Sequence, residues 1–290
     1  MSDLIREISI HSGIDLQGKD ETINLASKQP IHLRVQSEKA TFFLKIGSSN
    51  DLNRFTAEAR GLELISLTKT IQTPRVFSVG SIEDNAYILM EFLDMRGQTH
   101  YSALELGKQI AKMHKNSADS FGLEQTNWIG LTKQHNKQEV DWVVFFRDQR
   151  LLPQLELAYS KGYIAALEDK AKQLLNNLDV FFEDYSPVPS LLHGDLWSGN
   201  WGTLSNNKPI IFDPAVYYGD RETDIAMTLL FGGFPQEFYE SYNHTWSMSP
   251  SFNTRQDLYN LYHVINHLNI FGISYLPQSE NLLDKLISKL

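Results

Sequence analysis

The pattern of apolar and polar residues divides the chain into an early part with strand-like texture and a longer part with helical texture. Between residues 21 and 47, short runs rich in β-branched and aromatic residues alternate with turn-forming residues. Such runs, bounded by residues that favour turns, predict three antiparallel strands. The runs are Thr22–Leu25, His32–Val35 and Thr41–Ile46.

A helix is predicted on each side of these strands. Residues 3–11 have helical character, and Ser49 or Asn50 can cap a second helix that runs to about Leu67. In the second helix, apolar residues recur at helical spacing and fall on one face, at Phe55, Ala59, Leu62 and Ile65.

Two further strands, at Arg75–Val79 and Tyr87–Phe92, complete a β-β-β-α-β-β pattern, and the texture then becomes mainly helical from about Thr99. The expected helices are one that contains Leu106, Ile110 and Met113, then Val140–Tyr159, Ile164–Phe182, Glu222–Leu230, Pro235–Tyr242, Arg255–Phe271 and the C-terminal tail.

This order predicts an α+β protein with two lobes. We expect a small antiparallel β-rich lobe over residues 1–94 and a larger, mainly helical lobe over residues 95–290, joined near Glu91–Met95. A cleft between two lobes is a common place for a ligand.

Composition narrows the functional classes. The 290 residues carry a formal net charge of −9, which disfavours a large nucleic-acid footprint because such a surface is densely basic. There is no cysteine, so disulfides and thiolate metal sites are excluded. Met1–Arg6 does not lead into a long apolar stretch, and no run approaches the length of a membrane helix. We therefore expect a soluble cytoplasmic protein that binds neither nucleic acid nor membrane, with a monomer favoured.

The strongest candidate for chemistry is the stretch Leu191–Asn200, which is followed by an apolar run ending at Phe212. In it, Asp195 precedes Asn200 by five positions, and Asp213 follows the later run. This spacing is typical of kinases, in which the first Asp orients the acceptor hydroxyl and the Asn and second Asp hold magnesium. Taken singly, Asp195 could be a turn residue and Asp213 a loop-starting residue. Together they favour the catalytic interpretation.

A kinase also needs a cation that holds the nucleotide phosphates, paired with a carboxylate on the following helix. Lys45 lies on the third predicted strand, and Glu58 lies on the next helix, with Glu63 as a weaker rival. The alternatives are a solvent-facing lysine and a solvated helix glutamate, and alternation alone does not decide between them.

Three other residues near this stretch invite different interpretations. His193 follows two leucines, which favours a packed, hydrogen-bonded histidine over a catalytic base or a zinc ligand, since no zinc motif is present. Ser198 lacks the Gly-x-Ser-x-Gly elbow of a hydrolase nucleophile. Asp224 could brace the loop by accepting backbone N–H bonds, or it could be an ordinary acidic residue at a helix N-terminus.

These motifs resemble the fructosamine kinase (ketosamine 3-kinase) family of the protein-kinase-like and aminoglycoside phosphotransferase-like group. His-Gly-Asp-Leu-Trp-Ser-Gly-Asn and Gly-Asp-Arg-Glu are the most specific parts, and the resemblance extends over nearly the whole chain. The matching segments are Phe42–Lys45, Phe55–Ala59, Phe121–Leu123, Asn127–Gly130, Trp142–Phe146 through Arg150–Leu151, His193–Asn200, Phe212–Ala215, Tyr218–Glu222, Asp224–Met227, Leu261–His263 with Asn266–His267, and Phe271–Gly272.

The resemblance implies an ATP-dependent kinase that phosphorylates a sugar hydroxyl of ketoamines, either small molecules or protein-bound adducts, with Mg²⁺ as the metal. Because the 3-phosphate is unstable, the amine would be freed, which is a deglycation activity. The implied roles are Asp195 as base, Asn200 and Asp213 as magnesium ligands, Lys45 with Glu58 as the phosphate-holding pair, Glu91, Phe92 and Leu93 as the segment that meets adenine, and Trp197 as a residue on the acceptor side.

One departure from the family pattern keeps alternatives open. The turn between the first two strands commonly contains glycine in such kinases, but here it reads Ser27-Lys28-Gln29-Pro30, and no glycine occurs between Gly18 and Gly47. Glycine permits close approach of backbone N–H groups to phosphates, and proline has no N–H. The alternatives are a non-catalytic nucleotide-binding relative and a kinase of another alcohol, such as an aminoglycoside or choline.

Overall fold

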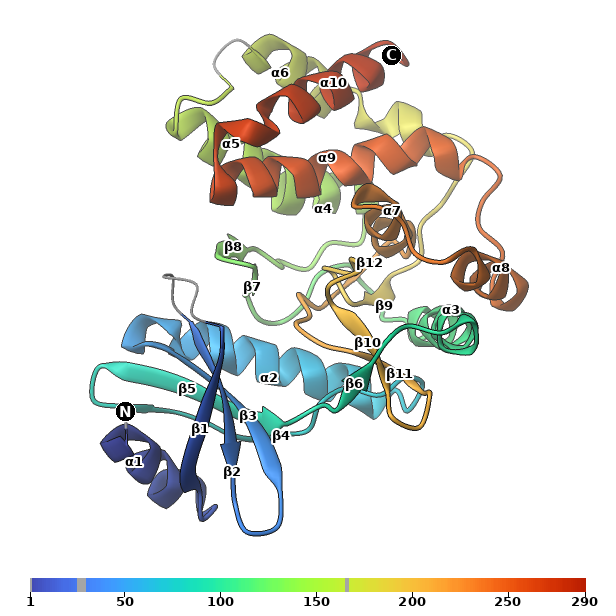
Figure 1. The fold of residues 1–290 in the computed structure, drawn as a ribbon. Coiled ribbons are helices and arrows are strands. Elements are labelled where there is room, and N and C mark those ends of the chain that lie inside the picture. Colours follow the sequence, from blue (N-terminus) through green and yellow to red (C-terminus); the bar gives the residue numbers. More distant parts are fainter. Residues whose placement is uncertain (1, 25–29, 165–166) are drawn as a thin grey trace. The chain divides into compact units, whose positions relative to one another are not determined.

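The protein consists of two compact units, each built from two segments of the chain. The computed structural model describes residues 2–24, 30–164 and 167–290 (Figure 1). The first unit comprises Met1–Thr99 with Gly202–Asp213, and the second comprises His100–Trp201 with Pro214–Leu290. The predicted lobes were the continuous segments 1–94 and 95–290, so the assignment of the short segment Gly202–Asp213 to the first unit was not anticipated.

A five-stranded antiparallel sheet with the order β1-β2-β3-β5-β4 forms the centre of the first unit (Figure 1). A smaller three-stranded sheet has the order β11-β10-β6. The elements are α1 (Ser2–Ser12), β1 (Gln17–Asn24), β2 (Ile31–Gln36), β3 (Thr41–Ser48), α2 (Leu52–Leu67), β4 (Val76–Ile82), β5 (Asn85–Glu91), β6 (Met95–Arg96), β10 (Trp201–Leu204) and β11 (Pro209–Ile211).

The two faces of the five-stranded sheet pack against different helices. Ile5 and Ile8 of α1 form one apolar cluster with Leu44 and other residues of the sheet. Phe55 and Leu62 of α2 form a second cluster with Ala86, Ile88 and Met90 of β5. Because side chains alternate along a strand, the residues that flank Leu44 belong to the α2 face. This places Lys45 toward α2, which alternation in the sequence could not decide.

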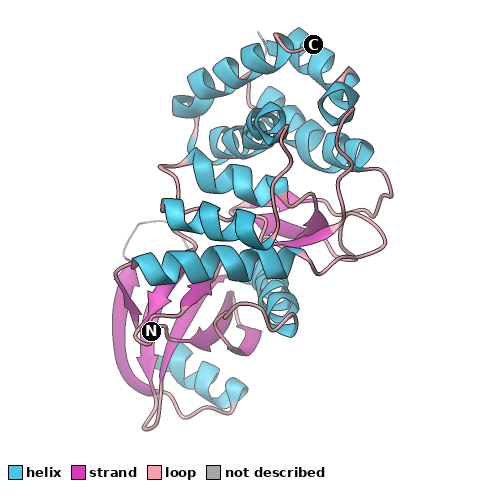
Figure 2. Ribbon diagram, turned by 90° about the vertical axis from the view of Figure 1, so that its right-hand side faces the viewer, coloured by secondary structure: helices cyan, strands magenta, loops and turns pink. Residues whose placement is uncertain are grey.

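The second unit is mainly helical (Figure 2). It also contains the short antiparallel strand pairs β12-β9 and β7-β8, which are labelled in Figure 1. Its elements are α3 (His100–His114), β7 (Asn127–Ile129), β8 (Thr132–Gln134), α4 (Trp142–Phe146), α5 (Leu152–Ser160), α6 (Glu168–Asn176), β9 (Ser190–Leu192), β12 (Tyr217–Gly219), α7 (Glu222–Leu230), α8 (Gln236–Thr245), α9 (Phe252–Phe271) and α10 (Leu276–Ile287), with a π-helical turn at Arg147–Leu151 and 3₁₀ turns at Leu178–Phe182 and Ile273–Tyr275.

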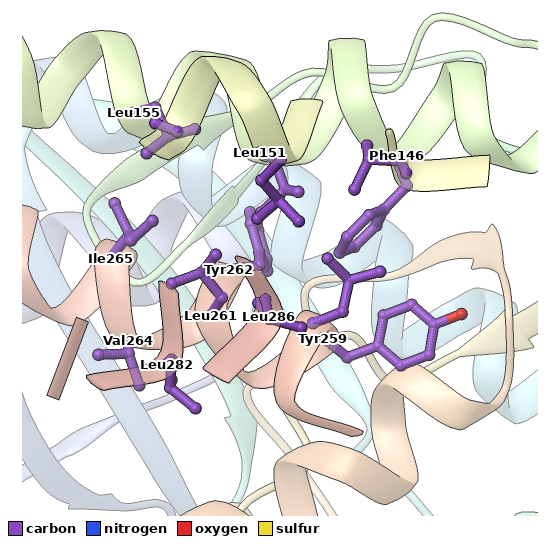
Figure 3. Packing of buried hydrophobic residues seen from close by; sticks show 14 of the residues in the cluster. Phe146, Leu151, Leu155, Tyr259, Leu261, Tyr262, Val264, Ile265, Leu282 and Leu286 are labelled. Atoms are coloured by element: carbon purple, nitrogen blue, oxygen red, sulfur yellow. The ribbon is translucent and has the colours of Figure 1, made fainter. Parts of the chain in front are cut away.

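The core of this unit is organised around α9. Tyr259, Leu261 and Ile265 are buried on this helix, and they belong to one cluster with residues of α4, α5 and α10 (Figure 3). Leu151 and Leu286 are fully buried members from neighbouring elements. A helix buried on most of its circumference serves as the centre of a bundle rather than as a surface helix.

Most of the predicted elements are confirmed, and the α+β class is confirmed with them, but one long helix changes its hydrogen-bond pattern part of the way along. The expected helix Val140–Tyr159 is interrupted by the π-helical turn Arg147–Leu151. Pro153 follows this turn and has no N–H to donate to the carbonyl of Gln149, so the α-helical pattern cannot pass through it. Arg150 Nη1 donates to that carbonyl instead, at 2.9 Å.

The segment predicted as helix Ile164–Phe182 is also divided, into α6 and a 3₁₀ turn, and residues 165–166 lie outside the described part. Leu25 of the first predicted strand and residues 27–29 of the turn before Pro30 lie outside the described residues as well.

Candidate active site

The loop that follows β9 in the second unit has a tightly constrained backbone. Gly194 has φ +82°, and a Cβ placed on it would lie 2.1 Å from the carbonyl oxygen of Ala215. Ala215 N donates to His193 O at 2.8 Å, which fixes the close approach of the two segments. Only glycine satisfies both the left-handed φ and the missing space. The glycine before Asp195 is therefore required by the local geometry.

Asp224 of α7 holds the beginning of this loop. Its Oδ2 accepts from His193 N at 2.7 Å, and its Oδ1 accepts from Gly194 N at 2.8 Å. Burial acts to raise the pKa of the Asp224 carboxyl, but the hydrogen bond from His114 and the backbone donors outweigh it and lower the pKa. Of the two interpretations of Asp224, the contacts match the bracing one.

Asp195 and Asn200 lie at opposite ends of the same turn. Asn200 Nδ2 donates to Asp195 O at 2.8 Å and to Asp195 Oδ2 at 3.1 Å. The turn is closed by backbone bonds from Trp197 N to Asp195 O and from Asn200 N to Trp197 O. These contacts fix the amide of Asn200 with its nitrogen toward Asp195.

His193 and Trp197 occupy different environments in the loop. His193 is completely buried, and its Nδ1 accepts from Asp195 N at 3.2 Å, as expected for a residue of the scaffold. Trp197 is 38% exposed, and a Cβ on Gly199 would lie 2.2 Å from the indole Cη2. Gly199 therefore allows the indole to lie across the loop, with part of the ring exposed.

In the first unit, Lys45 lies between two carboxylates. Its Nζ is 2.8 Å from Glu58 Oε1 and 2.5 Å from Asp213 Oδ1. The side chain of Lys45 is buried, whereas those of Glu58 and Asp213 are 13% and 45% exposed. Asp213 has φ +55°, a left-handed conformation that few residues other than Gly, Asn and Asp adopt. The rival Glu63 pairs instead with Arg60 on the surface, at 2.5 Å.

This arrangement shifts the pKa values of its members. Burial acts to lower the pKa of Lys45, but the carboxylates of Asp213 and Glu58 outweigh it and hold the pKa above its ordinary value. Burial raises the pKa of Glu58 to about 7, with Lys45 opposing the shift and Asp213 adding to it. Lys45 therefore remains charged, and one cation serves two carboxylates.

A cavity of about 460 Å³ lies in the first unit beside this group. All three residues of the predicted adenine segment, Glu91–Leu93, line this cavity. The guanidinium of Arg34, which also lines it, lies 4.8 Å from the centre of the Phe92 ring. The lining residues are His32, Arg34, Phe43, Pro74, Met90, Glu91, Phe92, Leu93, Met95, Phe212 and Asp213. The volume and the largely apolar wall suit a purine-sized ligand.

Sequence reasoning missed His32 and Arg34. In the antiparallel register His32 is opposite Lys45 and Arg34 is opposite Phe43, so both residues share the α2 face of the sheet. The alternation in 31–36 placed Leu33 and Val35 on the other face, and the strand register would have been needed to connect their polar neighbours with Lys45.

The described part of the chain contains neither a cluster of metal-binding side chains nor a helix that could span a membrane. Residues 2–24, 30–164 and 167–290 contain no cluster of three or more His, Asp or Glu side chains arranged to hold a metal ion. Within the same ranges, every helix is too short or too polar to cross a membrane.

The fold is that of the protein-kinase-like phosphotransferases. An aminoglycoside phosphotransferase solved in ternary complex with ADP and hygromycin B superposes with a TM-score of 0.68, at 12% identity over 98% of this chain and 97% of that one. The expected two-lobe, kinase-like fold is thereby confirmed. The family model for fructosamine kinase matches residues 12–289. The chain belongs to the fructosamine kinase family, as its motifs predicted.

Individual relatives agree with this assignment. A Vibrio parahaemolyticus protein named probable ketoamine kinase is 42% identical over 85% of each chain. The chloroplastic protein-ribulosamine 3-kinase of Arabidopsis thaliana is 38% identical over 92% of this chain and 81% of its own. A solved structure from Haemophilus somnus, assigned as a fructosamine-3-kinase, has a TM-score of 0.89 at 27% identity and covers 98% of this chain and 96% of that one. As a member of this family, the protein is a phosphotransferase with an alcohol group as acceptor.

Proposed function

We propose that the protein transfers the γ-phosphoryl group of ATP to a sugar hydroxyl of a ketoamine and thereby promotes deglycation. The observation that carries the proposal is the match to the fructosamine kinase family along residues 12–289, which includes the segments that contain Asp195, Lys45 and Asp213. Relatives named ketoamine kinase and protein-ribulosamine 3-kinase support the choice of acceptor class.

We assign the cavity of the first unit to the nucleotide. Glu91, Phe92 and Leu93 form part of its wall and would meet adenine, while Asp213 lines it close to Lys45. Lys45, charged and buried, would bind the α- and β-phosphates, with Glu58 holding its ammonium in place. A buried cation that is already oriented loses little entropy when the phosphates bind.

Asn200 and Asp213 are the residues we assign to Mg²⁺. Their amide and carboxylate oxygens are hard ligands of the kind that Mg²⁺ prefers, and Asn200 has its amide nitrogen engaged with Asp195. When bound, the ion would neutralise charge on the phosphates during transfer.

Asp195 would act on the acceptor. Its carboxylate is fixed by Asn200 at 3.1 Å and by the constrained loop around Gly194. In this position it would orient the sugar hydroxyl and accept its proton as the phosphoryl group is transferred. Trp197, with part of its indole exposed, would contact the acceptor. Decomposition of the resulting 3-phosphate would free the amine.

Replacing Asp195 by Asn tests this function directly. We expect Asp195→Asn to lower kcat by about 10²–10⁴, the usual contribution of a positioned base, with ATP binding retained. The measurement is ADP release in a screen of fructosamines, ribulosamines and erythrulosamines. Asp119→Asn, at an exposed position of the second unit, is the matched control. Native turnover in a folded Asp195→Asn variant would contradict the role of Asp195.

Two alternatives are decided by the same screen. A non-catalytic nucleotide-binding relative, suggested by the absence of glycine in Ser27–Pro30, would bind ATP without turning over any ketoamine. A kinase of another alcohol would turn over choline or an aminoglycoside in preference to the ketoamines.

A further inference from the structure

A chain of buried polar side chains connects α8 with the loop that carries Asp195. We propose that His114, on α3, is a positioning residue for this loop and acts through Asp224. This inference rests on the proposed function of Asp195, because a loop without a role in transfer would not need such support. His114 and Asp224 are completely or almost completely buried.

The contacts form a continuous path. His114 Nε2 lies 3.1 Å from Asp224 Oδ2, the same oxygen that accepts from His193 N at 2.7 Å. On the other side of the ring, His114 Nδ1 lies 2.8 Å from Tyr242 Oη. Arg221 Nη1 donates to that hydroxyl at 3.2 Å. Four side chains thus lie between the end of α8 and the backbone that precedes Asp195.

A donor and an acceptor can be assigned to every hydrogen bond along this path. An ionised Asp224 only accepts, so His114 Nε2 must donate to it. Tyr242 Oη already accepts from Arg221, and its single proton is then directed to His114 Nδ1. We assign His114 the tautomer with its proton on Nε2, in which every contact on the path is satisfied. Asp224 can then accept from the imidazole and from both loop N–H groups at once.

The packing of α3 against α8 makes this path possible. A Cβ on Gly107 would lie 2.1 Å from the carbonyl oxygen of Phe238, so the two helices approach with backbone almost in contact. Gly107 is two turns before His114, and Phe238 is one turn before Tyr242, so both pairs project from the same packed faces. The close approach brings the phenol of Tyr242 to the imidazole.

The far end of the path is anchored by Arg221. Its guanidinium donates to Trp246 O at 3.0 Å and to Ser247 O at 2.5 Å, and it lies 4.0 Å from the centre of the Trp246 ring. Arg221 therefore ties Tyr242 to the backbone that follows α8. A rigid anchor at this end leaves the imidazole few alternative positions.

Loss of the imidazole would disturb the loop through Asp224. Without the imidazole donor, the buried Asp224 carboxylate loses one of its hydrogen bonds and is free to rotate away from the loop to find another donor. The N–H groups of His193 and Gly194 would then lose their acceptor, and Asp195 follows these residues directly. The contribution of His114 would therefore be seen in the order of the loop and in kcat, and not in nucleotide binding.

The test compares His114→Leu, which fills the space without a donor, with His114→Gln, whose amide nitrogen can take the place of Nε2. We expect His114→Leu to speed amide hydrogen exchange at His193 and Gly194 by about tenfold or more, as befits the loss of a hydrogen bond to a charged group. It should lower kcat for the ketoamine about 10- to 100-fold with little change in KM for ATP, and His114→Gln should restore most of both. His244→Leu, at an exposed position of α8, is the control.

Tyr242→Phe supplies a second variant that removes a single hydroxyl. It should produce a smaller change in the same direction at the same two amides. Native exchange rates at His193 and Gly194 in folded His114→Leu would overturn the proposal. Uniformly faster exchange over α9 as well as the loop, without rescue by Gln, would also overturn it in favour of a general stabilising role. Since exchange needs no substrate, the result stands even if the native protein turns over no ketoamine, which would count against the proposed function alone.

Discussion

Lys45 Nζ and Asp213 Oδ1 lie 2.5 Å apart, although the two residues are separated by 168 positions in the sequence. Both belong to the first unit, because Gly202–Asp213 packs with the N-terminal residues. Glu58 accepts from the same ammonium at 2.8 Å. One lysine thus compensates the carboxylate of Glu58 and the carboxylate that we assign to the metal.

Replacing Lys45 by Met should impair phosphoryl transfer. The variant loses the cation assigned to the phosphates, and we expect kcat/KM for ATP to fall by about 10²–10³, as when one oriented donor is removed from an active site. Steady-state kinetics with ATP as the varied substrate gives this value. Lys172→Met, which removes an exposed ion pair with Glu168, is the control and should leave turnover unchanged. Equal effects of the two substitutions would contradict the assignment of Lys45.

The buried carboxyl group of Glu222, on α7, should make stability depend on pH near neutrality. Glu222 is completely buried and pairs with Arg255 at 2.7 Å. Burial raises the pKa of Glu222 to about 7, and the nearby Asp220 adds to the shift while Arg255 opposes it. In the unfolded chain the pKa is about 4.5. Between these values the folded state binds more protons, so its stability falls as the pH rises from about 4.5 to about 7.

Glu222→Gln removes this titration, so the melting temperature of the variant should gain on that of the native protein as the pH rises over that window. Thermal unfolding at several pH values between 5 and 8 measures the slope. A pH dependence should remain in the variant, because the pKa of Glu58 is also raised to about 7 and burial lowers the pKa of His263 to about 3. Glu156→Gln, at an exposed position of α5, should keep the native slope. A slope in Glu222→Gln identical to the native one would show that this carboxyl does not titrate there.

Alanine substitutions at two glycines with similar φ angles should distinguish the free-energy cost of backbone strain from that of a steric clash. Gly162 has φ +74°, and a Cβ placed on it would meet no neighbouring atom within 4 Å, whereas Gly194 has φ +82° and its Cβ would lie 2.1 Å from Ala215 O. Gly162→Ala should cost about 1–2 kcal/mol from the left-handed conformation alone. Gly194→Ala should cost more and should also lower kcat, by about 10²-fold if Asp195 moves by 1 Å. Melting temperatures and kcat of the two variants provide the comparison, and a Gly194→Ala enzyme with native kcat would mean that the loop tolerates displacement.

Local patterns were sufficient to predict much of the fold. Helix α7 begins and ends where the sequence indicated, and the apolar face of α2 buries Phe55, Leu62 and Ile65 as its spacing required. The three-residue strands β7, β8, β9 and β12 were not predicted, because periodicity cannot be recognised in so short a run. The π-helical turn before Pro153 was not predicted, although the proline itself was the available signal.

The candidate site could be predicted only as far as its motifs reach. Spacing predicts Asp195, Asn200 and Asp213 as site residues, and a place on a strand next to a helix with Glu58 predicts Lys45. The connection between His114 and Tyr242 joins residues 128 positions apart on two helices, and no pattern within either helix indicates the partner. The same limit applies to His32 and Arg34, whose place in the cavity depends on the pairing of β2 with β3.

The position of Gly202–Asp213 in the first unit has a consequence for biosynthesis. During translation, the residues up to Thr99 leave the ribosome well before β10 and β11, and the whole first part of the second unit is made in between. Until Asp213 is added, Lys45 has only Glu58 as its partner, and β6 lacks the strand with which it pairs. The nascent first unit therefore stays incomplete until more than two thirds of the chain has been synthesised, and a fragment that ends at Thr99 would lack the second segment of this unit permanently.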